Sequence, residues 1–363
     1  MTPRQKFFFL LCLFASAVAV FRLWSIRSRE AAAPAALVAR EPAVFFRNRL
    51  DSLLAPERPV VARAGSLVLV ATGAENEEPV LRVLGPDGKA LSRRPVPGLG
   101  AAVQACVSDG AAFLFSEEAF VPIDPDGAPG AAARLVDSPA GLKTFRIDKN
   151  VLALVSVDPG KTVTFRAYRL DGSPVREGAS FAAPGAPAAR AGLARLENGN
   201  YLVVWIDGGR MMSAEVSVIG EIKRAPGVLC APDAGSEIRA LSAASGGVRA
   251  RVAWEESSAA GGVFETEVGA DGSAGAVSRL GPAGSGAPRL LGVSGEVVWT
   301  GGKNAEFLFA GGGGREPVSY RAPGPIEAFD AASDGSAFAV TVREKDTHGL
   351  YAGFSVPPAG QSG

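Results

Sequence analysis

The sequence predicts an all-β fold built from seven similar four-stranded antiparallel units. The first observation is a short apolar strand that recurs at a mean step of about 45 residues. The second is a tight-turn sequence, rich in Gly, Asn and Asp, directly before each of these strands. The third is a pair of later turn series, one with Asp-Gly and one rich in Pro, Gly and Ala, that keep the same phase.

Each repeat contains one strongly apolar strand, and three of these strands end in Trp. Each unit is a strand, a tight turn, the apolar strand, a longer loop, a third strand, an Asp-Gly turn and a fourth strand. This meander is the unit of a β-propeller blade, so we predict a seven-bladed β-propeller over residues 58–358. A β-sandwich with regularly spaced strands is the alternative. The apolar strands are Leu67–Val70, Ala112–Phe115, Val151–Val155, Tyr201–Trp205, Val252–Trp254, Val297–Trp299 and Ala337–Val340.

The last repeat is incomplete, because the sequence after residue 356 holds Pro357, Pro358 and a short tail over 359–363. A propeller ring closes without an exposed strand edge only if another segment supplies the missing strand. The nearest candidate on the N-terminal side is Val44–Arg47, although the same residues also suit a short helix. We expect residues 30–57 to form a linker with a short apolar segment and residues 359–363 to be a flexible tail.

The N-terminal residues 1–29 have the pattern of a signal peptide or a membrane anchor. Arg4 and Lys6 precede an apolar run from Phe7 to Phe21, and Trp24 follows shortly after. The run is short for a membrane span, but basic residues at its end would allow an uncleaved helix to reach across. Both alternatives place the protein in the cell envelope, exported across the inner membrane and then either tethered or released.

Composition excludes two classes of function. The 37 basic and 37 acidic residues give zero net charge and a pI near 6.7, which argues against a nucleic-acid-binding protein. A single histidine, His348, excludes a zinc site with several His ligands and leaves little capacity for acid–base catalysis near neutral pH. We expect His348 to be an ordinary surface-loop residue.

The loops between the second and third strands of the units are rich in acidic residues. Because they should lie on one face of the ring, they predict an acidic face that binds a cation or a basic partner. The alternative is that charged loop tips only keep the protein soluble. The residues of this candidate face are Glu75, Glu77, Glu78, Glu117, Glu118, Asp207, Glu255, Glu256, Glu344 and Asp346.

Other residues could bind a metal, form a disulfide or bind a ligand, but each can equally have a purely structural role. Asp124 and Asp126 resemble a fragment of a calcium loop, but calcium needs six to eight oxygen ligands and the same turn recurs elsewhere with one Asp. We predict no other cofactor. Cys106 and Cys230 lie in units too far apart for a disulfide, so we expect both thiols to be reduced. The repeated Trp residues should pack between blades.

The repeat phase over Arg58–Pro358 and the unit Gly199–Asp207 resemble the degenerate seven-bladed propellers common among exported bacterial proteins. The sequence lacks the Gly-His and Trp-Asp pair of regular WD40 repeats and the Ser-x-Asp-x-Gly-x-Thr-Trp box of sialidase-like propellers. This resemblance implies a role in binding or scaffolding and no particular reaction.

The leading hypothesis is a non-enzymatic, exported or membrane-tethered propeller that presents a binding face to a protein or a cell-envelope ligand. The alternative is an exported carbohydrate hydrolase or lyase, which requires two carboxylates about 5 to 10 Å apart in a deep pocket. A third hypothesis is a subunit of a membrane complex that docks through its Pro-Gly loops.

Overall fold

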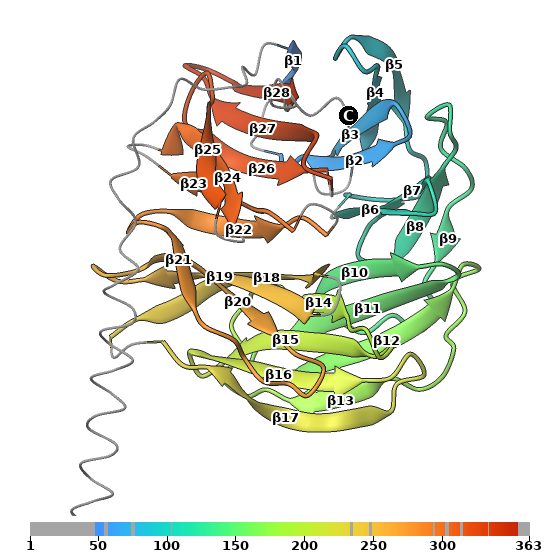
Figure 1. Ribbon diagram of the computed structural model, residues 1–363. Coiled ribbons are helices and arrows are strands. Elements are labelled where there is room, and N and C mark those ends of the chain that lie inside the picture. Colours follow the sequence, from blue (N-terminus) through green and yellow to red (C-terminus); the bar gives the residue numbers. More distant parts are fainter. Residues whose placement is uncertain are drawn as a thin grey trace, which may run out of the picture.

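The computed structural model is an all-β, seven-bladed propeller of four-stranded antiparallel sheets, as predicted (Figure 1). The sheets follow one another around a ring in chain order, and the first blade lies beside the last. The structure describes residues 48–53, 57–73, 77–102, 104–232, 235–246, 249–292, 295–301, 305–312, 315–332 and 334–354.

Each blade begins with an inner strand at the ring centre and continues outward, and we number the blades one to seven in chain order. Blade one is β2 (Val60–Ala64), β3 (Leu67–Thr72), β4 (Val80–Leu84) and β5 (Ala90–Pro95); blade two is β6 (Gln104–Ser108), β7 (Ala111–Phe115), β8 (Ala119–Ile123) and β9 (Ala133–Arg134); blade three is β10 (Leu142–Asp148), β11 (Val151–Asp158), β12 (Thr162–Arg169) and β13 (Ala179–Ala182).

The remaining blades follow the same order. Blade four is β14 (Gly192–Arg195), β15 (Tyr201–Asp207), β16 (Arg210–Val216) and β17 (Ile222–Cys230); blade five is β18 (Glu237–Gly246), β19 (Arg249–Ser257), β20 (Gly262–Val268) and β21 (Ser278–Gly281); blade six is β22 (Gly286–Leu290), β23 (Val297–Gly301), β24 (Phe307–Gly312) and β25 (Arg315–Arg321); blade seven is β26 (Ile326–Ala331), β27 (Ala337–Arg343), β28 (His348–Phe354) and β1 (Asn48–Leu53).

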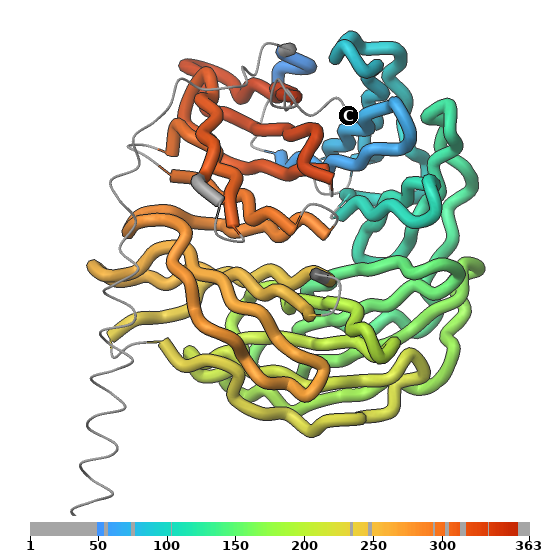
Figure 2. The backbone as a smooth tube through the Cα atoms, in the orientation of Figure 1, coloured from blue at the N-terminus to red at the C-terminus, as the bar shows by residue number. Residues whose placement is uncertain are grey.

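A strand from the N-terminal side completes the last blade, as the sequence predicts. β1 pairs antiparallel with β28, from Asn48 opposite Ala352 to Leu53 opposite His348, so the first and last described strands lie in one sheet (Figure 2). The strand begins just after the predicted Val44–Arg47, which lies outside the described residues, and it falls inside the segment 30–57 that we expected to be a linker.

The turn chemistry that predicts the repeats is present in the backbone. The glycines of the Asp-Gly series and their equivalents have φ between 78° and 86° in five blades, a left-handed conformation that favours glycine. At Gly172 a Cβ would also lie 2.0 Å from the carbonyl oxygen of Arg134, so this position has no space for a side chain.

The core lies between neighbouring blades, and the repeated Trp residues belong to it, as predicted. Trp205, Trp254 and Trp299 are at most 1% exposed. Trp205 stacks on Phe181 of the preceding blade with ring centroids 5.3 Å apart. Packing of this kind holds each sheet to the next and fixes the inner strands around the ring centre.

The N-terminal segment of the sequence analysis, with Phe7, Phe21 and Trp24, lies outside the described residues. Within the part of the chain that the structure describes, no helix is both long and apolar enough to cross a membrane.

Candidate functional site

The inner strands of blades two to seven, together with Arg58 just before β2, surround a cavity of about 830 Å³ at the ring centre. We call this cavity the channel. Successive side chains of a strand point to opposite faces, so alternate residues of each inner strand face the channel or its neighbouring blade. The size is typical of sites that hold a small molecule or part of a partner.

The channel is lined with arginine. Five of its described lining residues are arginines and one, Glu327, is acidic. The arginines come from five blades. Arg58, Arg190 and Arg239 lie near the start of an inner strand or just before it, whereas Arg146 and Arg289 lie farther along β10 and β22. The five are Arg58, Arg146, Arg190, Arg239 and Arg289.

The end of the channel where the inner strands begin is its mouth. In an antiparallel meander, this end also carries the loops between the second and third strands of each blade. We call this side of the ring the mouth face. It therefore combines the basic channel with the acidic loops that the sequence analysis singles out.

Arg289 is fixed by a buried carboxylate. Its Nε lies 2.5 Å from Oδ1 of Asp330, which is 2% exposed. The other oxygen of Asp330 accepts a hydrogen bond of 2.8 Å from the backbone N–H of Val61. One side chain therefore connects blades six, seven and one, and Arg289 lines the channel.

Arg190 is held in the same manner from two sides. Its guanidinium donates to the backbone oxygen of Lys143, and a second nitrogen lies 3.2 Å from Oε1 of Glu117. Lys143 itself is buried, with its Nζ 3.7 Å from Glu117. One carboxylate thus faces two cations.

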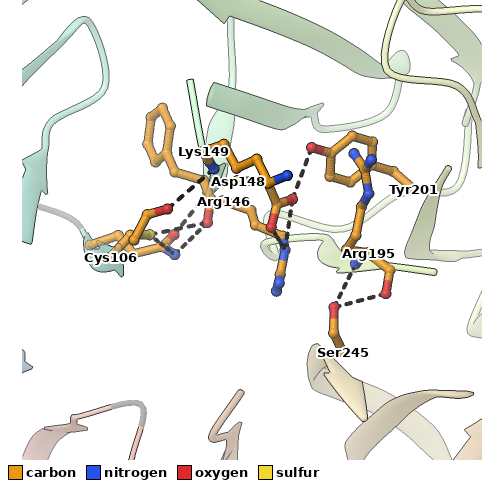
Figure 3. Close-up of polar contacts among 10 residues, drawn as sticks. Cys106, Arg146, Asp148, Lys149, Arg195, Tyr201 and Ser245 are labelled. Atoms are coloured by element: carbon orange, nitrogen blue, oxygen red, sulfur yellow. Dashed lines mark hydrogen bonds and ion pairs between the residues drawn. The ribbon is translucent and has the colours of Figure 1, made fainter. Parts of the chain in front are cut away.

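Arg146 lies deeper in the channel, on β10 (Figure 3). Its Nε is 3.2 Å from Oδ2 of Asp148, and this carboxylate also accepts the hydroxyl hydrogen of Tyr201 at 2.9 Å. Burial and the Asp148 charge raise the pKa of Tyr201 well above its ordinary value, so the hydroxyl stays a donor. The contact joins blades three and four.

Arg58 and Arg239 have no hydrogen-bond or ion-pair partner among the described residues, and both are accessible to water in the channel. The pKa of Arg58 is lowered to about 10, first by desolvation and next by the charge of Arg289, while the charge of Asp330 acts in the opposite direction. Arg58 therefore remains cationic near neutral pH and lies in a region of positive potential.

Glu327 pairs with two side chains of its own blade. Its oxygens accept from Nε of Arg343 at 2.8 Å and lie 2.5 Å from Nδ1 of His348. His348 is thus a half-buried partner of a channel carboxylate, and the expectation of an ordinary surface-loop residue was wrong. It was missed because Glu327 is 21 residues away in the sequence.

Side-chain hydrogen bonds between neighbouring inner strands make the channel wall rigid. Gln104 of blade two makes two bonds, of 2.6 and 2.9 Å, to the backbone of Phe145 in blade three. Ser245 of blade five bonds both backbone groups of Arg195 in blade four at 2.8 Å (Figure 3). The arginines therefore project from a framework fixed in register.

Cys106 lines the channel beside Gln104, and Cys230 lies on the outer strand of blade four. Neither forms a disulfide within the described residues, in agreement with the expectation of reduced thiols. Burial raises the pKa of the Cys106 thiol to about 11, so the thiol is protonated near neutral pH.

Most carboxylates of the predicted acidic face form contacts with other groups of the protein. They accept hydrogen bonds or form ion pairs with arginines and with backbone and side-chain donors of the same protein. Glu117 and Glu118 pair with Arg190 and Arg134, Asp207 and Glu255 accept from the N–H groups of Gly185 and Ala287, Glu256 accepts from Trp254, and Glu344 accepts from Arg49 and Tyr351.

Three exposed members of that face have no such contact within the described residues. They are Glu77, Glu78 and Asp346. Glu75 lies outside the described residues. The acidic surface is therefore a set of separate charges around the mouth, and its role in binding stays a prediction.

Asp124 and Asp126 lie in a hairpin turn like those of other blades. Gly127 donates to the backbone oxygen of Asp124, and the Asp126 carboxylate accepts the N–H of Ala128 at 3.3 Å. Across the described ranges, no group of three or more His, Cys, Asp or Glu side chains could hold a metal ion. The calcium hypothesis gains no support from this geometry.

The carbohydrate-enzyme alternative requires two carboxylates in the channel. Glu327 is the one acid among the described lining residues, and its carboxylate is already in contact with Arg343 and His348. The binding face predicted from the sequence consisted of acidic residues and did not include the arginines that line the channel. A signal was present, because Arg58, Gln104, Arg146, Arg190, Arg239 and Arg289 follow one another at 42 to 50 residues, close to the repeat length.

Comparison with solved structures supports the fold. The chain is similar to BBS1N, solved in complex with ARL6DN, with a TM-score of 0.58 and 12% identity over 88% of this chain and 99% of that chain. It is also similar to the Neurospora crassa Pan2 WD40 domain, with a TM-score of 0.50 and 11% identity over 83% and 90%. At these identities the likeness shows the propeller fold alone. No protein-family model and no curated protein matches the sequence.

Proposed function

We propose that this protein is a non-enzymatic binding propeller whose mouth face docks a protein partner at the cell envelope. The observation that supports this most strongly is the pair Arg58 and Arg239, two accessible cations at the mouth without a carboxylate partner among the described residues. A rigid ring that presents unneutralised charge in a central cavity is suited to binding, because the charges are already in position before the partner arrives.

The rim of the same face offers charge of the opposite sign. Glu77, Glu78 and Asp346 are exposed there and would contact a cation or a basic segment of the partner. An acidic segment of that partner would enter the basic mouth. Charge complementarity of this kind selects a partner and increases the association rate more than it increases affinity.

Site-specific photo-crosslinking in cells tests this proposal. A photo-reactive residue replaces Asp346 on the mouth face or Arg176, an exposed residue in the connection between β12 and β13 on the opposite face. We expect adducts of defined mass from position 346 only, and a loss of most of them when Arg58→Glu and Arg239→Glu are combined. Equal adducts from both positions, or none from position 346, would refute the proposal.

We further propose that the protein is exported and either tethered or released, on the basis of the apolar run Phe7–Phe21. The intact mass of the native protein from separated membrane and soluble fractions tests this. A full-length chain in the membrane fraction supports an anchor, and a shortened chain in the soluble fraction supports a cleaved signal. A full-length chain confined to the cytoplasm would contradict both.

A further inference from the structure

We propose that the channel mouth is a binding site for a ligand that carries two or more oxyanion groups, held between Arg58, Arg190 and Arg289. The inference rests on the proposed function in assigning the mouth face as the binding surface. It goes further in naming the chemistry of the ligand and the residues that recognise it.

The three arginines converge from three blades. Arg58 precedes the inner strand of blade one, Arg190 precedes that of blade four, and Arg289 lies on that of blade six. All three line the same cavity. A ligand that reached all of them would therefore extend from the mouth into the channel, which a single small anion such as chloride cannot do.

Two of these side chains are already ordered, and each still has donors to offer. A guanidinium has five N–H donors. Asp330 engages the Nε of Arg289, and Glu117 with the Lys143 carbonyl engages two nitrogens of Arg190. Because the protein has fixed these side chains in advance, a ligand loses little additional side-chain entropy when it binds their remaining donors.

The lining arginines, Lys143 and the carboxylates that pair with them carry a positive charge in total. Arg58, Arg146, Arg190, Arg239, Arg289 and Lys143 are six cations, and Asp330, Glu117 and Asp148 are the three carboxylates that pair with members of this group. Glu327 does not reduce this excess, because Arg343 compensates it.

The arginines also repel one another. After desolvation, the charge of Arg289 is the largest influence that lowers the pKa of Arg58, and it acts in the same direction on Arg190. Like charges held together by a rigid wall are stabilised when an anion lies between them. The site is therefore arranged to favour an anionic ligand over a neutral one.

The chemistry of the guanidinium defines the ligand class. Its planar fork matches the two oxygens of a carboxylate or a phosphate and forms short, charge-assisted hydrogen bonds with them. Three forks favour a ligand with several such groups. Polycarboxylates and phosphate-bearing ligands share this chemistry, and the cavity of about 830 Å³ admits either as a small molecule or as one segment of a larger partner.

Isothermal titration of the purified full chain with two probes, citrate and pyrophosphate, tests the inference at constant ionic strength. We expect at least one probe to bind with one site per chain and to be at least about 100-fold tighter than acetate, and the preferred probe identifies the carboxylate or the phosphate source. Binding of neither, or binding no tighter than acetate, would overturn the inference.

Variants locate the site. Arg58→Gln should weaken binding by about tenfold or more, because it removes one charge-assisted contact. It should leave the fold intact, since Arg58 has no partner within the described residues. Arg176→Gln on the opposite face is the matched control and should change nothing. Equal effects of the two variants would show that binding is non-specific and would refute the site.

Different experimental results would refute the docked protein partner and the oxyanion site. Probe binding that depends on Arg58, without crosslinks from position 346, would support the oxyanion site and refute the docked protein. Crosslinks that depend on the mouth arginines, without binding of either probe, would support the docked protein and refute the oxyanion site.

Discussion

Replacing Asp330 with Asn and with Ala should destabilise the propeller by two different amounts. Asp330 is buried and bonds Arg289 of blade six through one oxygen and the backbone N–H of Val61 in blade one through the other. Asn keeps an oxygen for Val61 and loses the charge, whereas Ala loses both. The pair of variants therefore separates the ion pair from the hydrogen bond that joins the first and last blades.

The magnitudes follow from burial. Removing one partner of a fully buried ion pair costs about 3 to 5 kcal/mol, but the Arg289 side chain is 25% exposed in the channel and water solvates part of its charge. We therefore expect Asp330→Asn to lower the free energy of unfolding by about 2 kcal/mol. Asp330→Ala also leaves the buried Val61 N–H without an acceptor, which adds about 2 kcal/mol.

Thermal unfolding followed by circular dichroism measures both effects. For a chain of this size, about 1 kcal/mol corresponds to about 2 °C, so we expect decreases in Tm of about 4 °C for Asn and about 8 °C for Ala. Asp346→Asn, an exposed carboxylate without a partner among the described residues, is the control and should leave Tm unchanged. Equal Tm values for Asp330→Asn and Asp330→Ala would refute the role of the Val61 hydrogen bond, and a wild-type Tm for both would refute the role of Asp330 in closure.

Two further predictions concern the core and the channel wall. Trp254→Phe should lower the free energy of unfolding by about 1 to 3 kcal/mol more than Trp205→Phe in urea unfolding. The reason is that the Trp254 indole N–H satisfies the buried Glu256, whereas the Trp205 N–H has no partner among the described residues; equal losses would contradict this. Above pH 9 the unfolded chain loses the Cys106 thiol proton before the folded protein does, since burial raises the folded pKa from 9.0 to about 11. Stability should therefore fall by up to about 1.4 kcal/mol per pH unit between pH 9 and 11, and Cys106→Ala should remove this part of the pH dependence; an unchanged profile would show that the thiol is not shielded.

The repeat was predictable because the same local chemistry recurs in every blade. Tight turns need residues that adopt positive φ, and Asp109 with Gly110 shows this directly, with φ of 50° and 79°. Strand alternation and turn phase are local properties, so a single sequence carries them. Blade number, strand order and the packing role of the Trp residues follow from this pattern.

Closure of the ring by a strand from the N-terminal side was predicted, but the position of that strand was not. The sequence Asn48–Leu53 contains Arg49, Asp51 and Ser52, which gives little apolar signal for a strand. Its outward position explains this composition, because β1 is an outermost strand that bonds a neighbour on one side only. Asp51 contributes instead by pairing with Arg82 and Arg93 of blade one.

The candidate site was the part that the sequence could not show, because it depends on pairing between distant residues. A single sequence does not reveal that Glu117 meets Arg190, 73 positions away, or that Asp330 meets Val61 at a separation of 269. Without those pairs, acids on loops indicate an acidic face.

These contacts between distant residues give the ring centre a positive charge in place of the predicted acidic face. The loop carboxylates form ion pairs and hydrogen bonds within the protein, whereas Arg58 and Arg239 have no carboxylate partner among the described residues. A neutral chain thereby presents positive charge where its rigid strands converge. Because uncompensated charge in a shaped cavity is costly to maintain unless a ligand or water satisfies it, the arginine-lined mouth is a stronger indication of the binding chemistry than the total of charges on the loops.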